Sequence, residues 1–134
     1  MCGIAGTFIL NNKDFVNHDQ LNKIKESLKK RGPDGENIWI SEDKKVSLVH
    51  TRLSIYDTSK SGEQPMSETT NRYMIVFNGS IFNYKELKLF LKRKRYKFFS
   101  NTDTEVILNL YKEKGVKFTK YLKGIYAIAI YDIE

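Results

Sequence analysis

The run Ile-Tyr-Ala-Ile-Ala-Ile-Tyr, residues 125–131, restricts the fold of this chain more than any other feature of its sequence. It is apolar at nearly every position, which is typical of a β-strand that is covered on both faces. Such a strand requires a packing layer on either side of its sheet. Because the run lies at the very end of the sequence, we also expect the chain to be incomplete at its C-terminal side.

Periodicity predicts further strands and helices along the rest of the sequence. Short apolar and β-branched runs predict strands, and apolar residues at helical spacing, bounded by capping residues, predict helices. The predicted strands cover residues 3–9, 37–41, 46–51 and 73–77, and the predicted helices with their caps cover 19–30, 83–96 and 102–115. Asn83 with Glu86, and Thr102 with Glu105, fit capping boxes. The polar stretch 57–70 is predicted to be a long surface loop.

Length and residue usage limit the classes to which the protein can belong. The 134 residues suffice for one domain but not for a second core. A single cysteine excludes an intrachain disulfide, and His18 and His50 are too far apart in sequence to indicate zinc, so no metal is expected. No stretch resembles a signal peptide or a membrane span. We therefore expect a soluble, cytoplasmic protein with no membrane partner.

The net charge of +7 raises the question of a nucleic-acid partner. Seven basic residues lie between Lys85 and Lys97, in a segment whose apolar residues Tyr84, Leu87 and Leu91 follow helical spacing. The basic residues are therefore expected to cover the solvated face of a helix, and no nucleic-acid partner is predicted.

Cys2 is the residue on which the predicted chemistry depends. Once Met1 is removed, Cys2 carries both a free α-amine and a thiol, and these groups titrate in neighbouring pH ranges, so that one can pass a proton to the other. Such a cysteine is a nucleophile that contains its own base. While Met1 stays attached, the nitrogen is an amide and has no basic lone pair. The alternative is that Cys2 is a small apolar residue buried near the terminus.

Three further positions carry groups suited to a small polar substrate. Arg52 interrupts an apolar stretch with a guanidinium that suits a carboxylate, although a salt bridge to a structural acid is equally compatible. Asn78-Gly79 is expected to end the strand 73–77, so that a side-chain amide and a backbone N–H aim at one point, as in an oxyanion hole. Asp103 lies in the first turn of a predicted helix, where the helix dipole favours an acid in any case.

Taken in order, the short motifs of this chain resemble those of the class II glutamine amidotransferase domain. They are Cys2-Gly3-Ile4-Ala5-Gly6, Arg31-Gly32-Pro33-Asp34, His50-Thr51-Arg52-Leu53-Ser54-Ile55, Gln64-Pro65-Met66, Asn78-Gly79-Ser80-Ile81-Phe82-Asn83, Asn101-Thr102-Asp103-Thr104-Glu105 and Lys123-Gly124-Ile125-Tyr126-Ala127. The second, third and fourth resemble the asparagine synthetase branch in particular. From residue type alone, Arg31 and Asp34 fit either a turn or the wall of a site.

The resemblance covers essentially the whole chain and implies its fold. That family has an N-terminal-nucleophile (Ntn) hydrolase fold, which is an α+β, four-layer αββα arrangement with two antiparallel sheets between helices. We therefore expect residues 1–134 to form one glutamine amidotransferase type 2 domain, incomplete at the C-terminus and without a synthetase domain.

The resemblance also implies a role for each candidate residue. Cys2 is expected to attack the side-chain amide of L-glutamine and form a thioester, while the Asn78 amide and the Gly79 N–H stabilise the oxyanion. Arg52 is expected to bind the α-carboxylate of glutamine, and Asp103 its α-ammonium. The remaining residues of the expected glutamine site are Leu53, Ser54, Ile55 and Ser80.

Two residues depart from the pattern of the branch. Ser80 stands where the branch usually has Glu, which removes a carboxylate and predicts weaker glutamine binding without loss of the chemistry. Phe82 replaces the usual Tyr.

The resemblance implies partners as well as a substrate. The ammonia is expected to serve ATP-dependent amide synthesis in a C-terminal synthetase domain that holds ATP and Mg²⁺, and no cofactor is expected in this domain. An open sheet edge can pair with another chain, so a homodimer is a candidate assembly. The alternative function is a catalytically silent regulatory or interaction module of the same fold.

Overall fold

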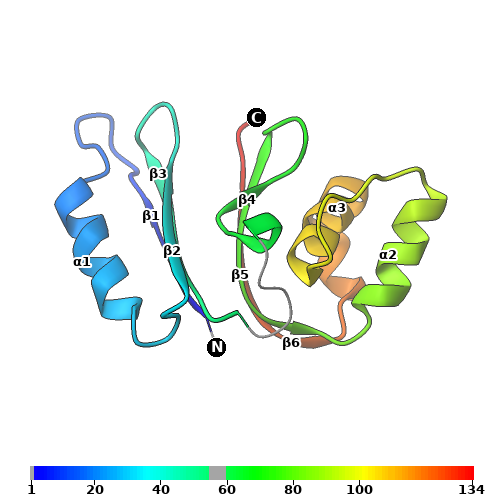
Figure 1. Cartoon of the computed structure of the whole chain (residues 1–134). Helices are drawn as coiled ribbons and strands as arrows, with labels where there is room; N and C mark the ends of the chain where they lie inside the picture. The colour runs from blue at the N-terminus through cyan, green and yellow to red at the C-terminus, as the bar shows by residue number, and fades with distance from the viewer. Residues whose placement is uncertain (1, 55–59) are drawn as a thin grey trace.

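The computed structural model describes residues 2–54 and 60–134, which form four layers in the order helix, sheet, sheet, helices (Figure 1). The first sheet has the strand order β1-β3-β2 and the second the order β4-β5-β6, and every strand pair is antiparallel. The strands are β1 (Gly3–Phe8), β2 (Gly35–Ile40), β3 (Val46–Arg52), β4 (Met66–Ser67), β5 (Tyr73–Ile81) and β6 (Gly124–Asp132). The helices are α1 (His18–Leu28), α2 (Tyr84–Arg93) and α3 (Asp103–Lys114), with 3-10 segments η1 (Lys60–Gly62) and η2 (Gly115–Tyr121). The four-layer α+β prediction is confirmed.

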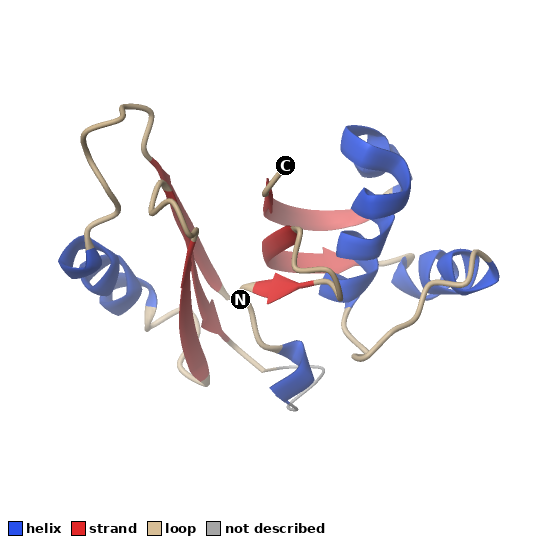
Figure 2. Ribbon diagram, turned by 90° about the horizontal axis from the view of Figure 1, so that it is seen from above, coloured by secondary structure: helices blue, strands red, loops and turns tan. Residues whose placement is uncertain are grey.

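Three apolar clusters hold the layers together, one at each interface. Val16, Leu21 and Val49 pack between α1 and the first sheet. Leu48, Met74 and Val76 pack between the two sheets, beside Trp39 and Tyr131, whose ring centroids are 5.5 Å apart. The largest cluster lies between the second sheet and the helices α2 and α3, which both cover the same face of that sheet (Figure 2). The core is therefore divided among three layers of side chains.

The predicted helices form close to their predicted bounds. Asn17 caps α1, with its side chain accepting a hydrogen bond from the Gln20 N–H at 3.1 Å, so the helix begins one residue earlier than expected. Thr102 caps α3 as predicted, and Gly115 ends it with φ +56°. The reciprocal half of the capping box does not form, because the Glu105 carboxylate accepts from the Phe99 and Ser100 N–H groups instead. Asn83 is the N-cap residue of α2, as predicted, but its side chain makes no capping hydrogen bond: it accepts from the Lys123 N–H and donates to the Tyr121 carbonyl. Competition from these partners overrides the local capping pattern.

Two strand predictions are wrong in a way that bears on the site. The strand predicted to end at Asn78-Gly79 continues to Ile81, because β6 pairs with it along its whole length. β6 itself was predicted to be covered on both faces, yet four of its nine residues are exposed, and Ile125 is 73% exposed. Within the described residues, β6 has one neighbouring strand only.

The stretch predicted as a loop, 57–70, is only partly irregular where it is described. Residues 60–62 form η1, and Met66–Ser67 form β4, paired with Met74 and Ile75 of β5. The loop prediction holds for the remaining described residues of this stretch.

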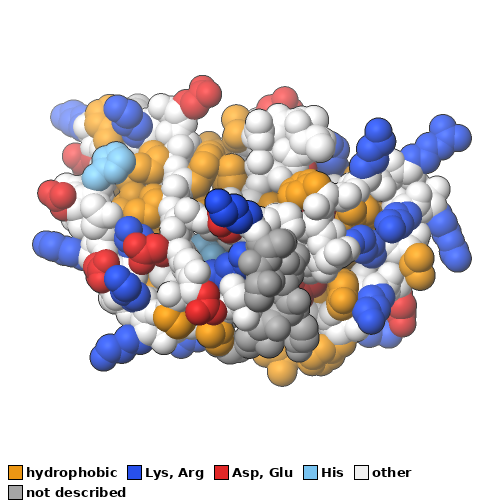
Figure 3. Space-filling view, in the orientation of Figure 1, with side chains coloured by type: hydrophobic (Ala, Val, Ile, Leu, Met, Phe, Trp, Pro, Cys, Tyr) orange, Lys and Arg blue, Asp and Glu red, His pale blue; other side chains and the backbone are white. Residues whose placement is uncertain are grey.

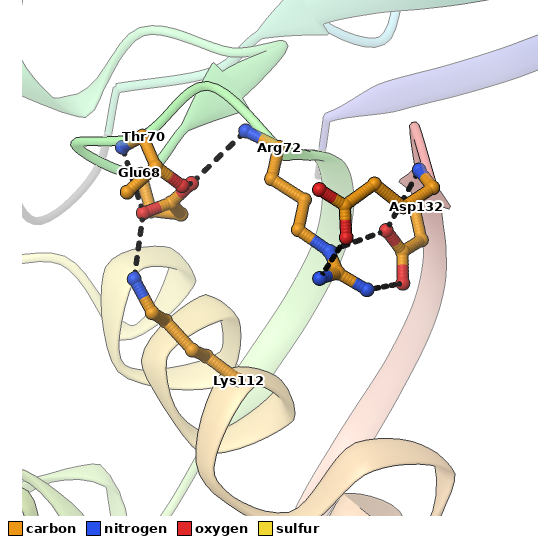
Figure 4. A network of polar contacts seen from close by, with 6 residues as sticks. Glu68, Thr70, Arg72, Lys112 and Asp132 are labelled. Atoms are coloured by element: carbon orange, nitrogen blue, oxygen red, sulfur yellow. Dashed lines mark hydrogen bonds and ion pairs between the residues drawn. The ribbon is translucent and has the colours of Figure 1, made fainter.

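A polar network fixes the turn between β4 and β5 (Figure 4). The Glu68 carboxylate accepts hydrogen bonds from the Thr70 and Arg72 N–H groups and from Lys112 Nζ of α3, at 2.9 to 3.0 Å. Burial opposes the charged form, but these bonds and the Thr70 hydroxyl together lower the pKa of Glu68 to about 2. Arg72 in turn binds Asp132 at the end of β6 through two hydrogen bonds.

The basic residues of α2 lie on its solvated face, as predicted. Leu87 and Leu91 are buried, whereas Lys85, Lys92 and Arg93 are exposed. Lysine and arginine side chains gather on the right of the space-filling view, over the end of the molecule where α2 lies in Figure 1 (Figure 3). Among the described residues, no helix is both long enough and apolar enough to cross a membrane.

Candidate active site

Strand alternation directs the candidate side chains into the space between the two sheets. Successive residues of a strand point to opposite faces, so residues two apart share a face. Ile4 and Leu48 lie in the cluster between the sheets, which gives Cys2, His50 and Arg52 the same direction. On β5, Met74 and Val76 lie in that cluster, which gives Asn78 and Ser80 the facing direction. Residues far apart in sequence thereby converge.

A cavity of about 530 Å³ lies where these side chains meet. Its lining includes every described residue of the predicted site, namely Cys2, Arg52, Leu53, Ser54, Asn78, Gly79, Ser80 and Asp103. Ile55 was also predicted but lies outside the described residues. Among the described residues of this lining, Asp103 is the only carboxylate and Arg52 the only guanidinium. The described wall therefore offers one anionic and one cationic side chain of opposite charge.

Cys2 is partly buried and is held at the end of β3. The Leu53 N–H donates to Cys2 Sγ at 3.4 Å, and the Leu53 carbonyl lies 3.9 Å from the sulfur. The Arg31 side chain donates from Nε to the Cys2 carbonyl at 3.3 Å. Cys2 is thus held at its sulfur by Leu53, directly after β3, and at its carbonyl by Arg31.

Residues 31–34 brace the site without lining it. A Cβ on Gly32 would lie 2.3 Å from the Thr51 carbonyl group, so only glycine lets this loop pack against β3. The Asp34 carboxylate accepts the Ser54 N–H at 2.7 Å, and the Asp34 N–H donates to the Arg52 carbonyl at 2.9 Å. The choice left open by the sequence, turn or site wall, is decided in favour of a supporting turn.

Gly79 lies in β5 and packs directly against the backbone of β6. Its φ is +154°, and a Cβ there would lie 2.2 Å from the Ile125 carbonyl oxygen and 2.7 Å from Tyr126 Cα. No side chain fits that space. The close approach explains why the residue after Asn78 is glycine even though the strand does not end there.

The edge of β5 that faces away from β6 carries the backbone groups nearest the cavity. Phe77 donates its N–H to Gln64 Oε1 at 2.6 Å, and Ile81 donates its N–H to Asp103 Oδ2 at 3.1 Å. In an antiparallel strand, alternate residues direct their N–H groups to the same edge. Gly79 lies midway between Phe77 and Ile81, so its N–H points to this edge between two N–H groups that are already bound.

Asp103 begins α3 and faces the cavity. Burial raises the pKa of its carboxyl, against the opposing effect of hydrogen bonds from backbone N–H groups, including that of Ile81. A nearby cation would restore the charged form.

Arg52 reaches the cavity from the end of β3. A Cβ on Gly62 would lie 2.6 Å from the Arg52 guanidinium, so the glycine of η1 leaves room for the arginine. The guanidinium therefore lies against η1 as well as against the cavity.

Three buried polar residues of the lining were missed by the sequence analysis as parts of this site: His50, Gln64 and Thr104. His50 is 1% exposed, and burial together with the nearby Arg52 charge lowers its pKa to about 4, so the imidazole is neutral at pH 7. The alternation of β3 could have indicated His50, which lies two residues before Arg52. Among the described residues, no three His, Cys, Asp or Glu side chains cluster as metal ligands do.

Known sequences and structures that are similar to this chain agree with the geometry of the cavity. All residues, 1–134, match the family described as the glutamine amidotransferase domain. A putative glutamine-hydrolysing asparagine synthetase 2 of Methanocaldococcus jannaschii is 37% identical over 98% of this chain and 28% of its own length. Glutamine-hydrolysing asparagine synthetase B of Escherichia coli K12 is 35% identical over 100% of this chain and 24% of its own length.

One solved structure supports the fold. Glutamine phosphoribosylpyrophosphate amidotransferase from Bacillus subtilis, complexed with ADP and GMP, superposes with a TM-score of 0.77 at 22% identity, over 97% of this chain and 35% of its own. The chain thus spans about a quarter of the length of the two synthetases it matches, and about a third of that amidotransferase.

Proposed function

This chain belongs to the family of glutamine amidotransferase domains, and from that premise we propose that it hydrolyses L-glutamine to glutamate and ammonia. The observation that carries the proposal is the convergence of Cys2, Asn78, Gly79, Arg52 and Asp103 on one cavity. These residues come from both sheets and from the start of α3. They supply a thiol, an amide, a backbone N–H, a cation and an anion, which are the groups that a zwitterionic amino acid with a reactive carboxamide requires.

Binding of glutamine is proposed to use the two charged groups of the cavity. Arg52 pairs with the α-carboxylate of glutamine through its planar guanidinium. Asp103 pairs with the α-ammonium, and this cation favours the ionised carboxylate despite its burial. Leu53, Ser54, Ile55 and Ser80 are proposed to complete the binding site. Ser80 supplies a hydroxyl and no charge, so the expectation of weaker glutamine binding stays a prediction.

The proposed reaction begins after removal of Met1. The free α-amine of Cys2 takes the thiol proton, and Sγ forms a bond to the side-chain amide carbon of glutamine. The negative charge that develops on the amide oxygen accepts hydrogen bonds from the Asn78 side chain and the Gly79 N–H. The carbon–nitrogen bond then breaks, and the amine returns its proton to the departing ammonia. Water, deprotonated by the same amine, then attacks the thioester carbon, the carbon–sulfur bond breaks and glutamate is released, and the amine returns its proton to Sγ.

We further propose that the ammonia is used for amide synthesis elsewhere in the same protein. The two synthetases are named for asparagine and are about four times longer than the matched region, which supports a C-terminal synthetase domain with aspartate as acceptor. ATP and Mg²⁺ are assigned to that domain. The described residues that line the cavity contribute one carboxylate, a donor set that suits an amino acid better than a Mg²⁺–nucleotide.

The test is ammonia release from glutamine by the purified protein and by Cys2→Ala. Intact mass first establishes that the preparation starts at Cys2. The processed wild type should release ammonia, and Cys2→Ala should lose the activity entirely because no other group supplies the nucleophile. Hydrolysis that survives in Cys2→Ala would rule out Cys2 as the nucleophile. The absence of hydrolysis in processed wild type that binds glutamine would favour the alternative of a catalytically silent module of the same fold.

A further inference from the structure

Gln64 joins the two elements that carry opposite ends of the proposed glutamine site. Its Oε1 accepts the Phe77 N–H of β5 at 2.6 Å, and its Nε2 donates to Thr104 Oγ1 of α3 at 3.2 Å. Phe77 precedes Asn78, and Thr104 follows Asp103. The side-chain amide of Gln64 therefore connects the strand that carries the proposed oxyanion donors to the helix that carries the proposed ammonium-binding carboxylate.

The register of the second sheet explains why a side chain takes this place. Met66 of β4 pairs with Ile75 of β5, so residue 64 lies opposite Phe77. β4 begins only at Met66, so the side-chain amide of Gln64 supplies the acceptor that a longer strand would have supplied. The Phe77 N–H on this edge is thereby hydrogen-bonded. Among the described residues, the Gly79 N–H, two residues further along the same edge, is left open.

Burial makes this arrangement sensitive to loss of a single bond. Gln64 is 6% exposed, Phe77 3% and Thr104 2%, so water does not replace a missing partner. His50, which is also buried, lines the same cavity as Gln64, Phe77 and Thr104.

We infer that Gln64 is a positioning residue for the glutaminase reaction, acting through Phe77 on the oxyanion donors Asn78 and Gly79 and through Thr104 on Asp103. The inference rests on the proposed function. Gln64 does not react with substrate; it sets the direction of the Gly79 N–H and its separation from Asp103. An oxyanion donor is effective only at hydrogen-bond distance from the developing charge, so a small rotation of this strand edge lowers the rate of carbonyl addition.

Gln64→Met is the variant that tests this inference, because it keeps the length of the side chain and removes both hydrogen bonds. Loss of one oxyanion donor costs about 10²–10³ in rate, so misplacing the pair is expected to lower kcat for glutamine about 10- to 100-fold. KM is expected to rise by a smaller factor than kcat falls, because Asp103 loses its support through Thr104 but Arg52 still binds the α-carboxylate. Gln20→Met, the same substitution at an exposed residue of α1, is the matched control and should behave as wild type.

A second readout separates positioning from damage to the nucleophile. Alkylation of Cys2 by iodoacetamide proceeds by displacement at carbon and uses no oxyanion hole, so its rate in Gln64→Met should stay within about twofold of wild type. Thr104→Val keeps the bond to Phe77 and removes the bridge to α3, and its kcat should fall less than that of Gln64→Met. Thr104→Ser keeps the hydroxyl and should retain more of kcat than Thr104→Val.

Three results would overturn the inference. The first is a kcat within about threefold of wild type in both Gln64→Met and Thr104→Val. The second is alkylation that falls in parallel with kcat, which would mean that Cys2 itself is disturbed. The third is a loss carried wholly by KM. Should Gln64→Met fail to fold, as judged by its thermal unfolding, Thr104→Val alone decides. A processed wild type that releases no ammonia would refute the proposed function itself, and this inference with it.

Discussion

Strand β3 is the more polar of the two strands β3 and β6, yet it is the more buried. β3 contains Ser47, His50 and Thr51, yet six of its seven residues are buried. β6 contains no polar residue between Gly124 and Asp132 other than tyrosines, yet four of its nine residues are exposed. β3 is the central strand of its sheet, with α1 on one face and the second sheet on the other, whereas β6 pairs with β5 alone among the described strands. The position of a strand within the layers, and not its amino-acid composition, decides how far it is buried here.

The same contrast separates their contributions to the site. β3 delivers Arg52, and the Leu53 N–H directly after it holds Cys2 Sγ; of the buried polar residues of β3, His50 also lines the cavity. β6 contributes mainly backbone, as the wall against which Gly79 is packed. An exposed strand can therefore be as constrained as a buried one where its main chain forms part of a close contact.

The largest expected effect tests the contrast in burial directly. Leu48→Ala removes a side chain of β3 that is 4% exposed between the sheets, and should lower the free energy of unfolding by about 2–5 kcal/mol. Ile125→Ala truncates a β6 side chain that is 73% exposed, and should change it by less than about 0.5 kcal/mol. Urea denaturation of both variants gives the two numbers. Similar losses in the two would show that β6 is covered in solution and would break the comparison.

The next effect tests β6 as a backbone wall. Gly79→Ala places a methyl group 2.2 Å from the Ile125 carbonyl oxygen, so β5 must shift and the Gly79 N–H is displaced. Glutamine turnover should fall about 10²–10³-fold, as for loss of one oxyanion donor. Gly115→Ala is the control: it also has positive φ, but a Cβ there meets nothing within 4 Å, so it should lose only stability, about 1–3 kcal/mol. A near-normal kcat in Gly79→Ala would show that the contact between Gly79 and the β6 backbone does not position the Gly79 N–H.

The smallest effect is a difference in pH response. The pKa of His50 in β3 is lowered to about 4 by burial and by Arg52, so between that value and its ordinary 6.5 the unfolded chain binds more protons than the folded one. Stability should therefore be fully present above pH 6.5 and fall as the pH drops toward 4, by about 2 kcal/mol from pH 7 to pH 5. His50→Asn should lose this dependence. A wild-type curve that stays flat across this window, measured by urea denaturation, would contradict the burial of a neutral imidazole.

β6 should respond in a different window. Asp132 at its end has its pKa lowered below the usual 3.8 chiefly by hydrogen bonding to Arg72, which outweighs the effect of burial. A carboxylate whose pKa is lowered by folding contributes stability above its ordinary value and loses it as the pH falls further. The contribution of Asp132 is therefore lost below about pH 4, after that of His50 has already declined.

Much of the fold was predictable because local patterns and tertiary packing agree. α1, α2 and α3 each show an apolar face and terminal residues suited to a helix, and each forms within a few residues of its predicted bounds. The predictions fail where a distant residue competes for a local group. Asn83 is drawn to Tyr121 and Lys123, and β5 is extended past Gly79 by its pairing with β6. No local pattern contains that information.

The candidate site was predictable in its reactive members and not in its supports. The side chains that offer a thiol, a guanidinium, an amide or a carboxylate are recognisable by type and by motif, and the described ones line one cavity. Gln64 was visible only as part of a motif, because its significance comes from lying opposite Phe77 and beside Thr104. Hydrogen bonds between residues 13 and 40 positions apart depend on how the layers are stacked.

By itself, the sequence determined which helices form, which residues carry reactive groups and to which face of each strand those groups point, because these properties depend on residue type and on periods of two or about 3.6 residues. Only the tertiary structure decided that β3 is buried and β6 exposed, that β5 continues past Gly79, and that Gln64 joins β5 to α3. The physical reason is that burial and buried hydrogen bonds require two surfaces in contact. Local sequence sets the residues on each surface, but only the packing of the layers sets which surfaces meet.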